Sequence, residues 1–278
     1  MTYLAIKDST FDLSHPHIMG ILNATPDSFS GDGIYNQAES AVERIGVMTS
    51  EGASIIDVGG ESTRPGSDTI AEEEELKRVL PILERAIPQF PDTFFSVDTT
   101  KYRVAEEALK LGTHFVNDIS GLQKEPRLVD LCVKYDAGYI MMHSQGDPKV
   151  MQQNPIYDDV VNDIFSFFEK QLLKTKEKGL EKVIIDPGIG FGKTLEHNLK
   201  LLAHLSRFKK LGSPVLVGAS RKSMLSSILG GRPADGRLAA TIATHYHALM
   251  QGANIIRVHD VKEAHDSLLV YEAIANQN

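Results

Sequence analysis

The sequence predicts an α/β fold: a single (β/α)8 barrel over residues 1–278, with its active site at the C-terminal ends of the strands. Three observations predict it. Eight short apolar runs recur along the chain, segments of helical periodicity separate them, and polar or charged residues follow each run. Short apolar strands that alternate with helices form a parallel sheet covered by helices. Eight such strands favour a closed barrel, a fold that takes roughly 250 residues as one domain.

The predicted strands are the eight apolar runs. They are Ile18–Leu22, Ser54–Val58, Phe94–Val97, His114–Val116, Tyr139–Met142, Val183–Ile185, Val215–Val217 and Ile255–Val258. Between consecutive runs the chain is long enough for a loop and a helix, as the barrel requires.

Helical periodicity is clearest in three of the intervening segments. Ile156–Lys178 carries apolar residues four positions apart, and Arg237–Met250 has a similar pattern. A third helix is expected to begin near Glu72, because Thr69 and Glu72 have the spacing of a capping box and acidic residues favour the positive end of a helix. The acidic run Glu72–Glu75 is expected to be a solvated helix start.

Polar residues stand at the C-terminal end of every predicted strand. In chain order they are Asn23, Asp57 with Glu61, Asp98, Asn117 with Asp118, His143, Asp186, Ser220-Arg221-Lys222, and Arg257 with His259 and Asp260. The C-terminal ends of all eight strands converge at one face of a barrel, which holds the active site. Any one of these residues could instead cap a helix or form a turn. For all eight strands together that alternative is a poor explanation.

Composition excludes several classes of function. The net charge of −8 argues against general binding to nucleic acids or to anionic membranes, since both need a basic face. No apolar run approaches the roughly 20 residues that span a bilayer, and the N-terminus lacks a signal-peptide pattern. We therefore expect a cytoplasmic protein. Cys132 is the only cysteine, which excludes an intramolecular disulfide, and its apolar surroundings predict a buried thiol.

Common metal and nucleophile motifs do not occur in the sequence. It has neither H-E-x-x-H nor C-x-x-C spacing, and no G-x-S-x-G elbow. His245 and His247 are two positions apart and cannot share a helix face, so we interpret them as structural or surface residues. His15 and His17 precede the first strand, at the end of the barrel opposite the expected site.

Two groups of side chains suggest two halves of one site. Ser220-Arg221-Lys222 and Arg257-Val258-His259 follow the last two strands, where α/β barrels frequently bind anions. Asp98, Asn117 and Asp186 are expected on the opposite arc of the mouth, where they could bind the donor-rich edge of an amino-pyrimidinone ring. Lone cations are usually surface groups, and buried carboxylates could be structural partners of a nearby Lys or Arg. The sequence leaves the role of the carboxylates open.

Three loops are rich in glycine, proline and polar residues: Asn23–Gly33, Gly59–Gly66 and Asp186–Thr194. Polar loops on a rigid scaffold are common ligand clamps. The third loop superficially resembles a phosphate-binding loop, but Pro187 occupies a position where that motif needs glycine. We therefore reject nucleotide binding there. The glycines are expected to fold the backbone tightly around a flat ligand beside Asp186.

Five motifs together resemble those of the dihydropteroate synthase family, in the family's order and from about residue 17 to about residue 270. They are Asn23-Ala-Thr-Pro-Asp-Ser-Phe-Ser, Gly59-Gly-Glu-Ser-Thr-Arg-Pro-Gly, Asp186-Pro-Gly-Ile-Gly-Phe-Gly-Lys, Ser220-Arg-Lys-Ser and Ile256-Arg-Val-His-Asp260. The resemblance implies an enzyme of folate synthesis that condenses 6-hydroxymethyl-7,8-dihydropterin pyrophosphate with p-aminobenzoate. Pyrophosphate and 7,8-dihydropteroate would be the products. It also implies a homodimer and a Mg²⁺ cofactor.

The resemblance assigns roles to particular residues of this chain. Those implied to surround the pterin are Asp98, Asn117, Met141, Asp186, Phe191, Gly218 and Lys222. Those implied to hold the pyrophosphate are Asn23, Arg257 and His259, with Asn23 also a Mg²⁺ ligand. Those implied to shape the p-aminobenzoate site and its loops are Thr63, Arg64, Pro65, Ser220, Asp27, Ser28 and Phe29. The residues expected to act in catalysis are Asp98, Lys222, Arg257 and His259.

One motif departs from the family pattern. The first loop of the family usually reads Ser-Asp-Gly-Gly, whereas this chain reads Ser30-Gly31-Asp32-Gly33. The loop carboxylate is displaced by one residue, so closure of this loop is expected to differ if Asp32 contacts the substrate.

Three rival hypotheses remain beside the synthase. A methyltetrahydrofolate-dependent methyltransferase domain would bind a pterin but has no use for the cations after the last two strands. A catalytically silent relative would bind pterin without turnover. An aldolase could use Lys222 as a Schiff base, which requires that lysine to be neutral near pH 7, and Arg221 beside it could lower its pKa.

Overall fold

A closed sheet of parallel strands lies at the centre of the computed structural model, which describes residues 2–25, 34–62, 67–146 and 155–277. Within these ranges eight strands pair in the order β8-β7-β6-β5-β4-β3-β10-β9. They are β3 (His17–Asn23), β4 (Ile55–Gly59), β5 (Phe94–Asp98), β6 (Phe115–Asp118), β7 (Gly138–Met142), β8 (Val183–Asp186), β9 (Leu216–Val217) and β10 (Ile255–Val258). A parallel bridge between Ile185 of β8 and Val215, just before β9, joins the two ends of this order. The predicted (β/α)8 barrel is confirmed, and each predicted strand is present.

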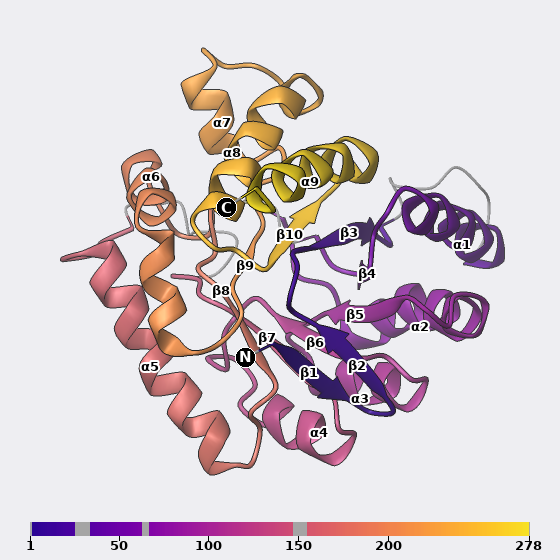
Figure 1. Ribbon diagram of the computed structural model, residues 1–278. Coiled ribbons are helices and arrows are strands. Elements are labelled where there is room, and N and C mark those ends of the chain that lie inside the picture. Colours follow the sequence, from indigo (N-terminus) through magenta and orange to yellow (C-terminus); the bar gives the residue numbers. More distant parts are fainter. Residues whose placement is uncertain (1, 26–33, 63–66, 147–154, 278) are drawn as a thin grey trace.

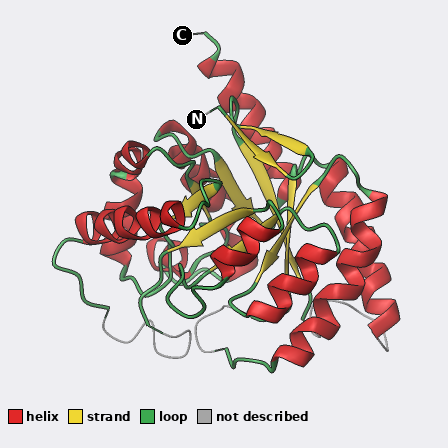
Figure 2. Cartoon of the chain, turned by 90° about the horizontal axis from the view of Figure 1, so that it is seen from below, coloured by secondary structure: helices red, strands yellow, loops and turns green. Residues whose placement is uncertain are grey.

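Helices surround the barrel in Figure 1, and in Figure 2 they lie outside the strands. They are α1 (Ile34–Ser50), α2 (Glu72–Gln89), α3 (Tyr102–Lys110), α4 (Leu128–Lys134), α5 (Val160–Glu177), α6 (Leu195–Ala203), α7 (Ser223–Ile228), α8 (Leu238–Met250) and α9 (Val261–Ala275). The two segments predicted from apolar periodicity form α5 and α8. Asp159 caps α5, because its carboxylate accepts hydrogen bonds from the N–H groups of Val161 and Asn162. None of the described helices is long and apolar enough to cross a membrane.

The start of α2 differs from the prediction in two respects. The helix begins at Glu72 as expected, but its N-cap is Ala71 and makes no side-chain hydrogen bond, so the predicted capping box at Thr69 is wrong. Glu75 is fully buried rather than solvated, and Lys101 pairs with its carboxylate. Four consecutive residues cover the whole circumference of a helix with about 3.6 residues per turn, so one of the four glutamates must face the barrel.

A short antiparallel hairpin, which the sequence analysis did not predict, closes the N-terminal end of the barrel. It consists of β1 (Tyr3–Ile6) and β2 (Ser9–Asp12). Its apolar residues join one side chain from each barrel strand in a single buried cluster. The cluster contains Leu4, Ile6, Phe11 and Leu13 together with Met19, Ile55, Phe94, Phe115, Ile140, Ile184, Leu216 and Ile255. The interior of the barrel is therefore a packed core at this end, and the opposite end is left for ligands.

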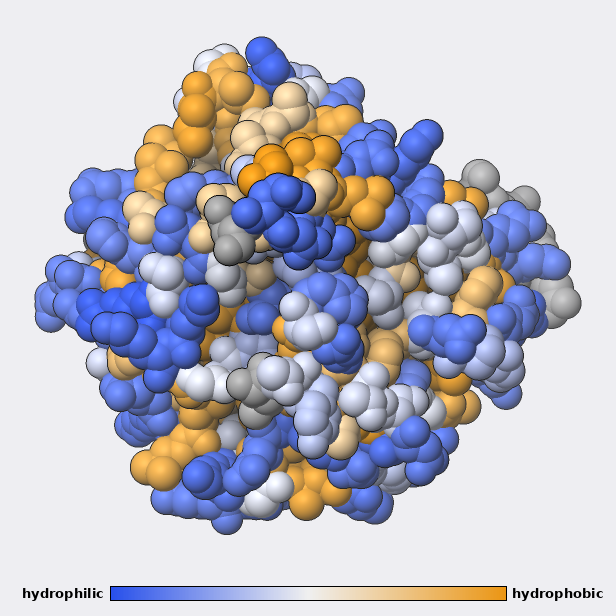
Figure 3. All heavy atoms as spheres, in the orientation of Figure 1, coloured by the Kyte–Doolittle hydropathy of each residue, from blue (hydrophilic) through white to orange (hydrophobic). Residues whose placement is uncertain are grey.

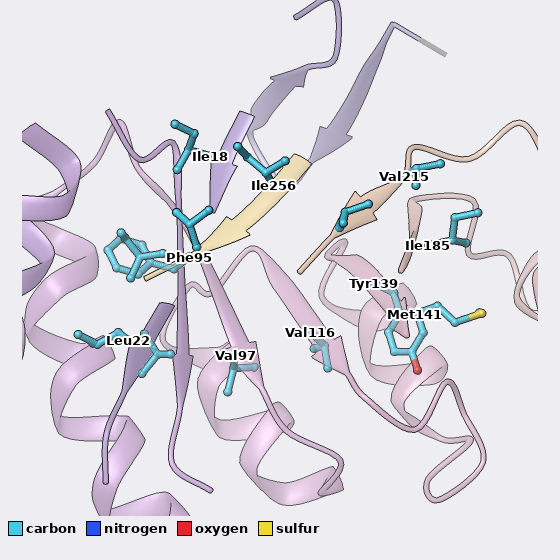
Figure 4. Close-up of a cluster of buried hydrophobic side chains, with 14 of the residues drawn as sticks. Ile18, Leu22, Phe95, Val97, Val116, Tyr139, Met141, Ile185, Val215 and Ile256 are labelled. Atoms are coloured by element: carbon cyan, nitrogen blue, oxygen red, sulfur yellow. The ribbon is translucent and has the colours of Figure 1, made fainter. Parts of the chain in front are cut away.

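Side chains alternate between the two faces of each strand, and this alternation positions the polar groups. The neighbours of the inner cluster along the strands face outward and pack on the helices. Figure 4 labels several of them, including Ile18, Val97, Val116, Met141 and Ile256. Positions two or four residues beyond the inner cluster face inward again, nearer the C-terminal end. They are Asn23, Asp57, Asp98, Asn117, Met142, Asp186, Gly218 and Arg257.

The predictions for Cys132 and His245 are confirmed, and His17 lies at the predicted end of the barrel. Cys132 is fully buried, and burial raises the pKa of its thiol. His245 is buried and accepts a hydrogen bond from the N–H of Ala219, so its role is structural. His17 begins β3 at the N-terminal end of the barrel, where it stacks on Phe11 of the hairpin.

Candidate active site

The guanidinium of Arg257 on β10 reaches past β3 and contacts carboxylates of β4 and β5. Its Nε donates to Oδ2 of Asp57 over 2.7 Å, and its Nη2 donates to Oδ2 of Asp98 over 2.9 Å. The cation Arg257 and the carboxylate of Asp98, expected on different arcs of the mouth, are thus in contact. Burial alone would lower the pKa of Arg257, but the two carboxylates raise it above its ordinary value.

Asp57 is a functional candidate to which the sequence analysis gave no role. It is fully buried, and its Oδ2 also accepts a hydrogen bond of 2.9 Å from Nδ2 of Asn117. A charged residue in the middle of the apolar strand Ile55–Gly59 was the available signal, because it occupies the inward position two residues after Ile55.

Burial raises the pKa of two carboxyls in the mouth, Asp98 and Asp186. Burial, and then the neighbouring charge of Asp57, raise the pKa of Asp98 to about 7 against the opposing effect of Arg257. Burial also raises the pKa of Asp186, although its Oδ1 accepts a 2.7 Å hydrogen bond from the N–H of Gly188. The Asp98 carboxyl can therefore change protonation state near neutral pH.

The ammonium group of Lys222 lies over the aromatic ring of Phe191. Its Nζ lies 3.9 Å from the centroid of the Phe191 ring, which is a cation–π contact. Burial, and then the charge of Arg257, lower the pKa of Lys222 to about 8, while Asp186 and Asp98 oppose that shift. Lys222 is therefore still mainly protonated at pH 7, which favours a charge-stabilising role over a Schiff base.

Lys193 is a second candidate that the sequence analysis passed over when it rejected the nucleotide-binding motif. It is buried, and its Nζ lies within hydrogen-bond distance of the carbonyl oxygen of Phe191 (2.9 Å) and of Nδ1 and the carbonyl oxygen of His143 (3.1 and 3.2 Å). Burial lowers its pKa to about 7. Lys193 thus attaches the glycine-rich loop to the end of β7.

The glycine-rich loop folds tightly beside Asp186, as predicted. Gly188 has a φ of 69°, and a Cβ added there would lie 1.9 Å from the carbonyl oxygen of His143. The loop brings Phe191 against Met142 at the mouth. Met141, which was expected beside the ring, instead faces outward in the core that packs on the helices, so that prediction is wrong. The alternation of side chains along β7 explains the difference.

Ser220 and His259 connect the ends of the last two strands. The Oγ of Ser220 lies 2.9 Å from Nδ1 of His259 and accepts a 3.2 Å hydrogen bond from its backbone N–H. Burial, and then Arg257, lower the pKa of His259 to about 3, so its imidazole is neutral. The neighbouring Arg221 pairs with Asp260 through Nε at 3.0 Å, which neutralises its charge. Of the expected anion-binding cations, Lys222 and Arg257 therefore remain the mouth-facing pair.

The remaining predicted residues divide into two groups. Gly218 opens to the mouth, because a Cβ added there would lie 3.7 Å from Cβ of Arg257 and 3.9 Å from Oδ2 of Asp186. Asn23 ends β3, paired in register with Gly59. The other predicted loop residues lie outside the described residues. They are Asp27, Ser28, Phe29, Asp32, Thr63, Arg64 and Pro65.

The described part of the mouth can hold a flat polar ring and an anion next to each other. Asn117 and Asp186 supply polar groups for a ring edge, Phe191 supplies an apolar face, and Lys222 and Arg257 supply positive charge. Among the residues that the structure describes, no group of three or more His, Cys, Asp or Glu could hold a metal ion.

Comparison with known proteins identifies relatives that align along nearly the whole chain. Residues 19–259 match the family model described as pterin binding enzyme. A dihydropteroate synthase of Escherichia coli (strain K12) is 47% identical over 272 residues, covering 97% of this chain and 95% of that protein. The crystal structure of the Yersinia pestis dihydropteroate synthase with a sulfonamide drug has a TM-score of 0.92 at 45% identity and covers 99% of both chains. The Xanthomonas albilineans dihydropteroate synthase with 4-aminobenzoic acid has a TM-score of 0.91 at 38% identity, covering 99% of this chain and 98% of that one.

Proposed function

The chain belongs to the pterin binding enzymes and, among them, to the dihydropteroate synthases, and from this premise we propose a role in the reaction for each residue of the site. The enzyme is a transferase of folate synthesis. It condenses 6-hydroxymethyl-7,8-dihydropterin pyrophosphate with p-aminobenzoate to give 7,8-dihydropteroate and pyrophosphate. The comparisons set aside the rival methyltransferase and aldolase hypotheses, and the turnover experiment below tests the silent relative.

The pterin binds among the inward-facing residues of β6, β8 and the glycine-rich loop. Asp186 accepts from ring N–H or amino groups, Asn117 adds a second polar contact, and Phe191 packs on the ring face. The burial of Asp186 and the 3.9 Å contact between Lys222 and Phe191 support this arrangement. Met142, which packs against Phe191, takes the place that the sequence analysis gave to Met141.

The reaction begins with loss of the leaving group. The bond between the methylene carbon and the pyrophosphate oxygen breaks, and its electron pair goes to the oxygen. The positive charge left on the carbon spreads into the electron-rich pterin ring, where ionised Asp98 stabilises it. Arg257, Lys222 and neutral His259 stabilise the departing anion, since each offers N–H donors.

The second half of the reaction forms the new bond. The nitrogen lone pair of p-aminobenzoate attacks the methylene carbon, and the nitrogen then loses one proton, so that dihydropteroate, pyrophosphate and a proton result. A neutral aniline needs little activation, so this step requires no strong general base. Ser220, Thr63, Arg64 and Pro65 are the residues we propose for the aminobenzoate side. A relative from Xanthomonas albilineans binds 4-aminobenzoic acid, which supports a site of this kind.

Mg²⁺ is part of the proposal, with Asn23 as the one protein ligand that we name. Mg²⁺ commonly keeps several waters and binds through one or two protein oxygens together with substrate phosphates. A single amide oxygen at the end of β3 fits that chemistry, and so does the lack of a three-residue acidic or histidine cluster among the described residues. When bound, the ion would neutralise charge on the pyrophosphate.

The contact between Arg257 and Asp98 is the observation that carries the proposal. Asp98 is the carboxylate proposed to stabilise the pterin cation, and Arg257 offers its positive charge to the leaving pyrophosphate. The purified protein is incubated with 6-hydroxymethyl-7,8-dihydropterin pyrophosphate and Mg²⁺, with and without p-aminobenzoate. The experiment measures the dihydropteroate and the pyrophosphate that are released. Arg257→Ala and Asp98→Asn are each expected to reduce kcat/KM by about 10²–10³-fold, typical of losing an electrostatic contact to a transition state. Arg103→Ala, which removes an exposed arginine on α3, is the matched control and leaves the rate unchanged. Pterin binding without any product would refute the synthase.

Four features remain proposals beyond the family: one domain over residues 1–278, a homodimer, a cytoplasmic location and the absence of nucleic-acid and membrane partners. Exposed apolar side chains on α7, α8 and α9 support the homodimer, among them Ile228, Met250 and Leu269. Figure 3 shows hydrophobic residues gathered at the top of the molecule, over α7 and α8. Limited proteolysis, sedimentation and cell fractionation test the first three.

A further inference from the structure

We propose that Asp57 is a positioning residue that fixes which end of the Asn117 amide faces the pterin, while it holds Arg257 across the mouth. The inference rests on the proposed function and deepens it, because it explains how the site would select the hydrogen-bonding pattern of a pterin edge. Asp57 itself is placed too deep to be counted among the ligand contacts, since it is fully buried.

The first step is the polarity of the hydrogen bond between β4 and β6. Asp57 Oδ2 accepts from Nδ2 of Asn117 at 2.9 Å and from Nε of Arg257 at 2.7 Å. An ionised carboxylate only accepts hydrogen bonds, whereas an amide has a donating end and an accepting end. Asn117 must therefore turn Nδ2 toward Asp57, which leaves Oδ1 as the amide atom that can accept from a ligand. A pterin presents N–H donors along its edge, so this orientation matches it.

The second step is the free-energy cost of Asp57. Its Oδ1 is buried and has no hydrogen-bond partner among the described residues. A buried polar atom without a partner destabilises a fold, and a buried ion pair is often no more stable than apolar residues of the same shape. Because the Asp57 carboxylate costs stability at this position, its presence favours a role in the site over a role in folding.

The third step is the link to Arg257. The same oxygen that orients Asn117 also accepts from Nε of Arg257 and lies 2.7 Å from Nη2, and this anchored Nη2 also reaches Oδ2 of Asp98. Oδ2 of Asp57 thereby fixes both the orientation of the Asn117 amide, which faces the pterin, and the position of Arg257, which faces the leaving group. The negative charge of Asp57 also raises the pKa of Asp98.

A purely structural Asp57 makes different predictions from a positioning one. If it served only as a counter-ion for a stable fold, its removal would weaken both substrates alike or only lower stability. If it sets the polarity of Asn117, its removal weakens pterin recognition and leaves p-aminobenzoate recognition nearly unchanged.

The test compares Asp57→Asn with Asp57→Ser and Asp57→Ala in the full-length enzyme. Asparagine can place its carbonyl oxygen where Oδ2 lies and accept the same two hydrogen bonds without the charge. Serine ends one bond short of Oδ2, so no acceptor fixes Nδ2 of Asn117 and the amide can take either orientation. The Asp57→Ser and Asp57→Ala variants are expected to raise the KM for the pterin pyrophosphate by about 10- to 100-fold, as expected for misplacing one or two buried hydrogen bonds. Asp57→Asn is expected to recover most of that loss, and the KM for p-aminobenzoate stays within about threefold throughout.

Calorimetric binding of 6-hydroxymethylpterin gives a readout that does not depend on turnover. In the wild type, a ring analogue with an unprotonated nitrogen in place of the N–H donor that faces Asn117 is expected to bind more weakly. In Asp57→Ser this penalty shrinks toward none, because Asn117 can rotate and donate from Nδ2 to that nitrogen. Asp118→Asn is the control for loss of a buried carboxylate, since Asp118 faces outward and binds Tyr139 and the N–H groups of Ser120 and Leu122. It is expected to lower stability without changing pterin affinity.

Two results would overturn the inference: equal weakening of both substrates in Asp57→Ser, or a penalty for replacing the ring N–H by an unprotonated nitrogen that is the same in Asp57→Ser and wild type. If Asp57→Ala fails to fold, the serine and asparagine variants still decide the question. Failure of the proposed function is a separate outcome, namely a wild-type protein that binds pterin and forms no dihydropteroate.

Discussion

Nη2 of Arg257 lies 2.9 Å from Oδ2 of Asp98, so the proposed leaving-group cation and the proposed cation-stabilising carboxylate are paired before substrate binds. A pyrophosphate group that attracts Arg257 would compete with Asp98 for the guanidinium. The charge on Asp98 would then be available to the pterin as positive charge develops on it. The two proposed roles are therefore coupled through one ion pair.

The pH dependence of kcat/KM is expected to be bell-shaped. Burial and Asp57 raise the pKa of Asp98 to about 7, so activity falls as pH drops below that value and the carboxyl becomes neutral. Burial and Arg257 lower the pKa of Lys222 to about 8, so activity falls again above pH 8 as the ammonium loses its charge. Each limb approaches about a tenfold change per pH unit. Asp98→Asn is expected to remove the acid limb alone, and a limb that persists in that variant would assign it to another group.

Lys101 is expected to be a large contributor to stability. Its Nζ pairs with Glu75, which is fully buried, and with Glu61, which lies two residues after the end of β4. Lys101→Met leaves Glu75 as a buried charge without its cation, which typically costs about 3–5 kcal/mol. Urea denaturation measures the loss, and adding Glu75→Gln should recover much of it.

The matched control for that pair is Arg103 with Glu73, both well exposed. Arg103→Ala is expected to change the free energy of unfolding by no more than about 1 kcal/mol, because solvent screens exposed pairs. Equal effects of Lys101→Met and Arg103→Ala would contradict the importance of burial.

The sequence predicts the barrel well, because eight buried strands and their polar ends follow from hydrophobic periodicity. The same alternation distinguishes inward from outward positions, yet it has to be applied in register: Met142 rather than Met141 meets Phe191, and Asp57 follows Ile55 into the interior. The spacing of residues along the sequence does not show which partners a long side chain such as that of Arg257 reaches. The contact of Arg257 with Asp57 and Asp98 therefore needed the three-dimensional structure.

Lys193 is expected to stabilise the glycine-rich loop. Lys193→Met leaves the carbonyl oxygens of Phe191 and His143 without their Nζ donor, and each unsatisfied buried group costs about 1–3 kcal/mol. Because Phe191 belongs to the proposed pterin site, the KM for the pterin substrate should rise as well. Lys200→Met is the control: Lys200 is exposed and pairs with Glu196 one turn away, so its loss should change stability by less than about 0.5 kcal/mol. Similar denaturation midpoints for the two variants would contradict this prediction.

Gly188 and Gly212 separate two costs of replacing glycine. Both have positive φ, 69° and 76°, so alanine is strained at either position, at a conformational cost of about 1–2 kcal/mol. Gly212 has open space around a new Cβ, and Gly212→Ala should show only that cost. At Gly188 the new Cβ would lie 1.9 Å from the carbonyl oxygen of His143, which belongs to backbone and can move only if the loop moves.

Gly188→Ala is therefore expected to lose more stability than Gly212→Ala in thermal denaturation. It should also raise the pterin KM, since the loop carries Phe191 and its N–H at Gly188 holds Asp186. Equal stability losses with an unchanged pterin KM would show that the loop can shift without disturbing the site.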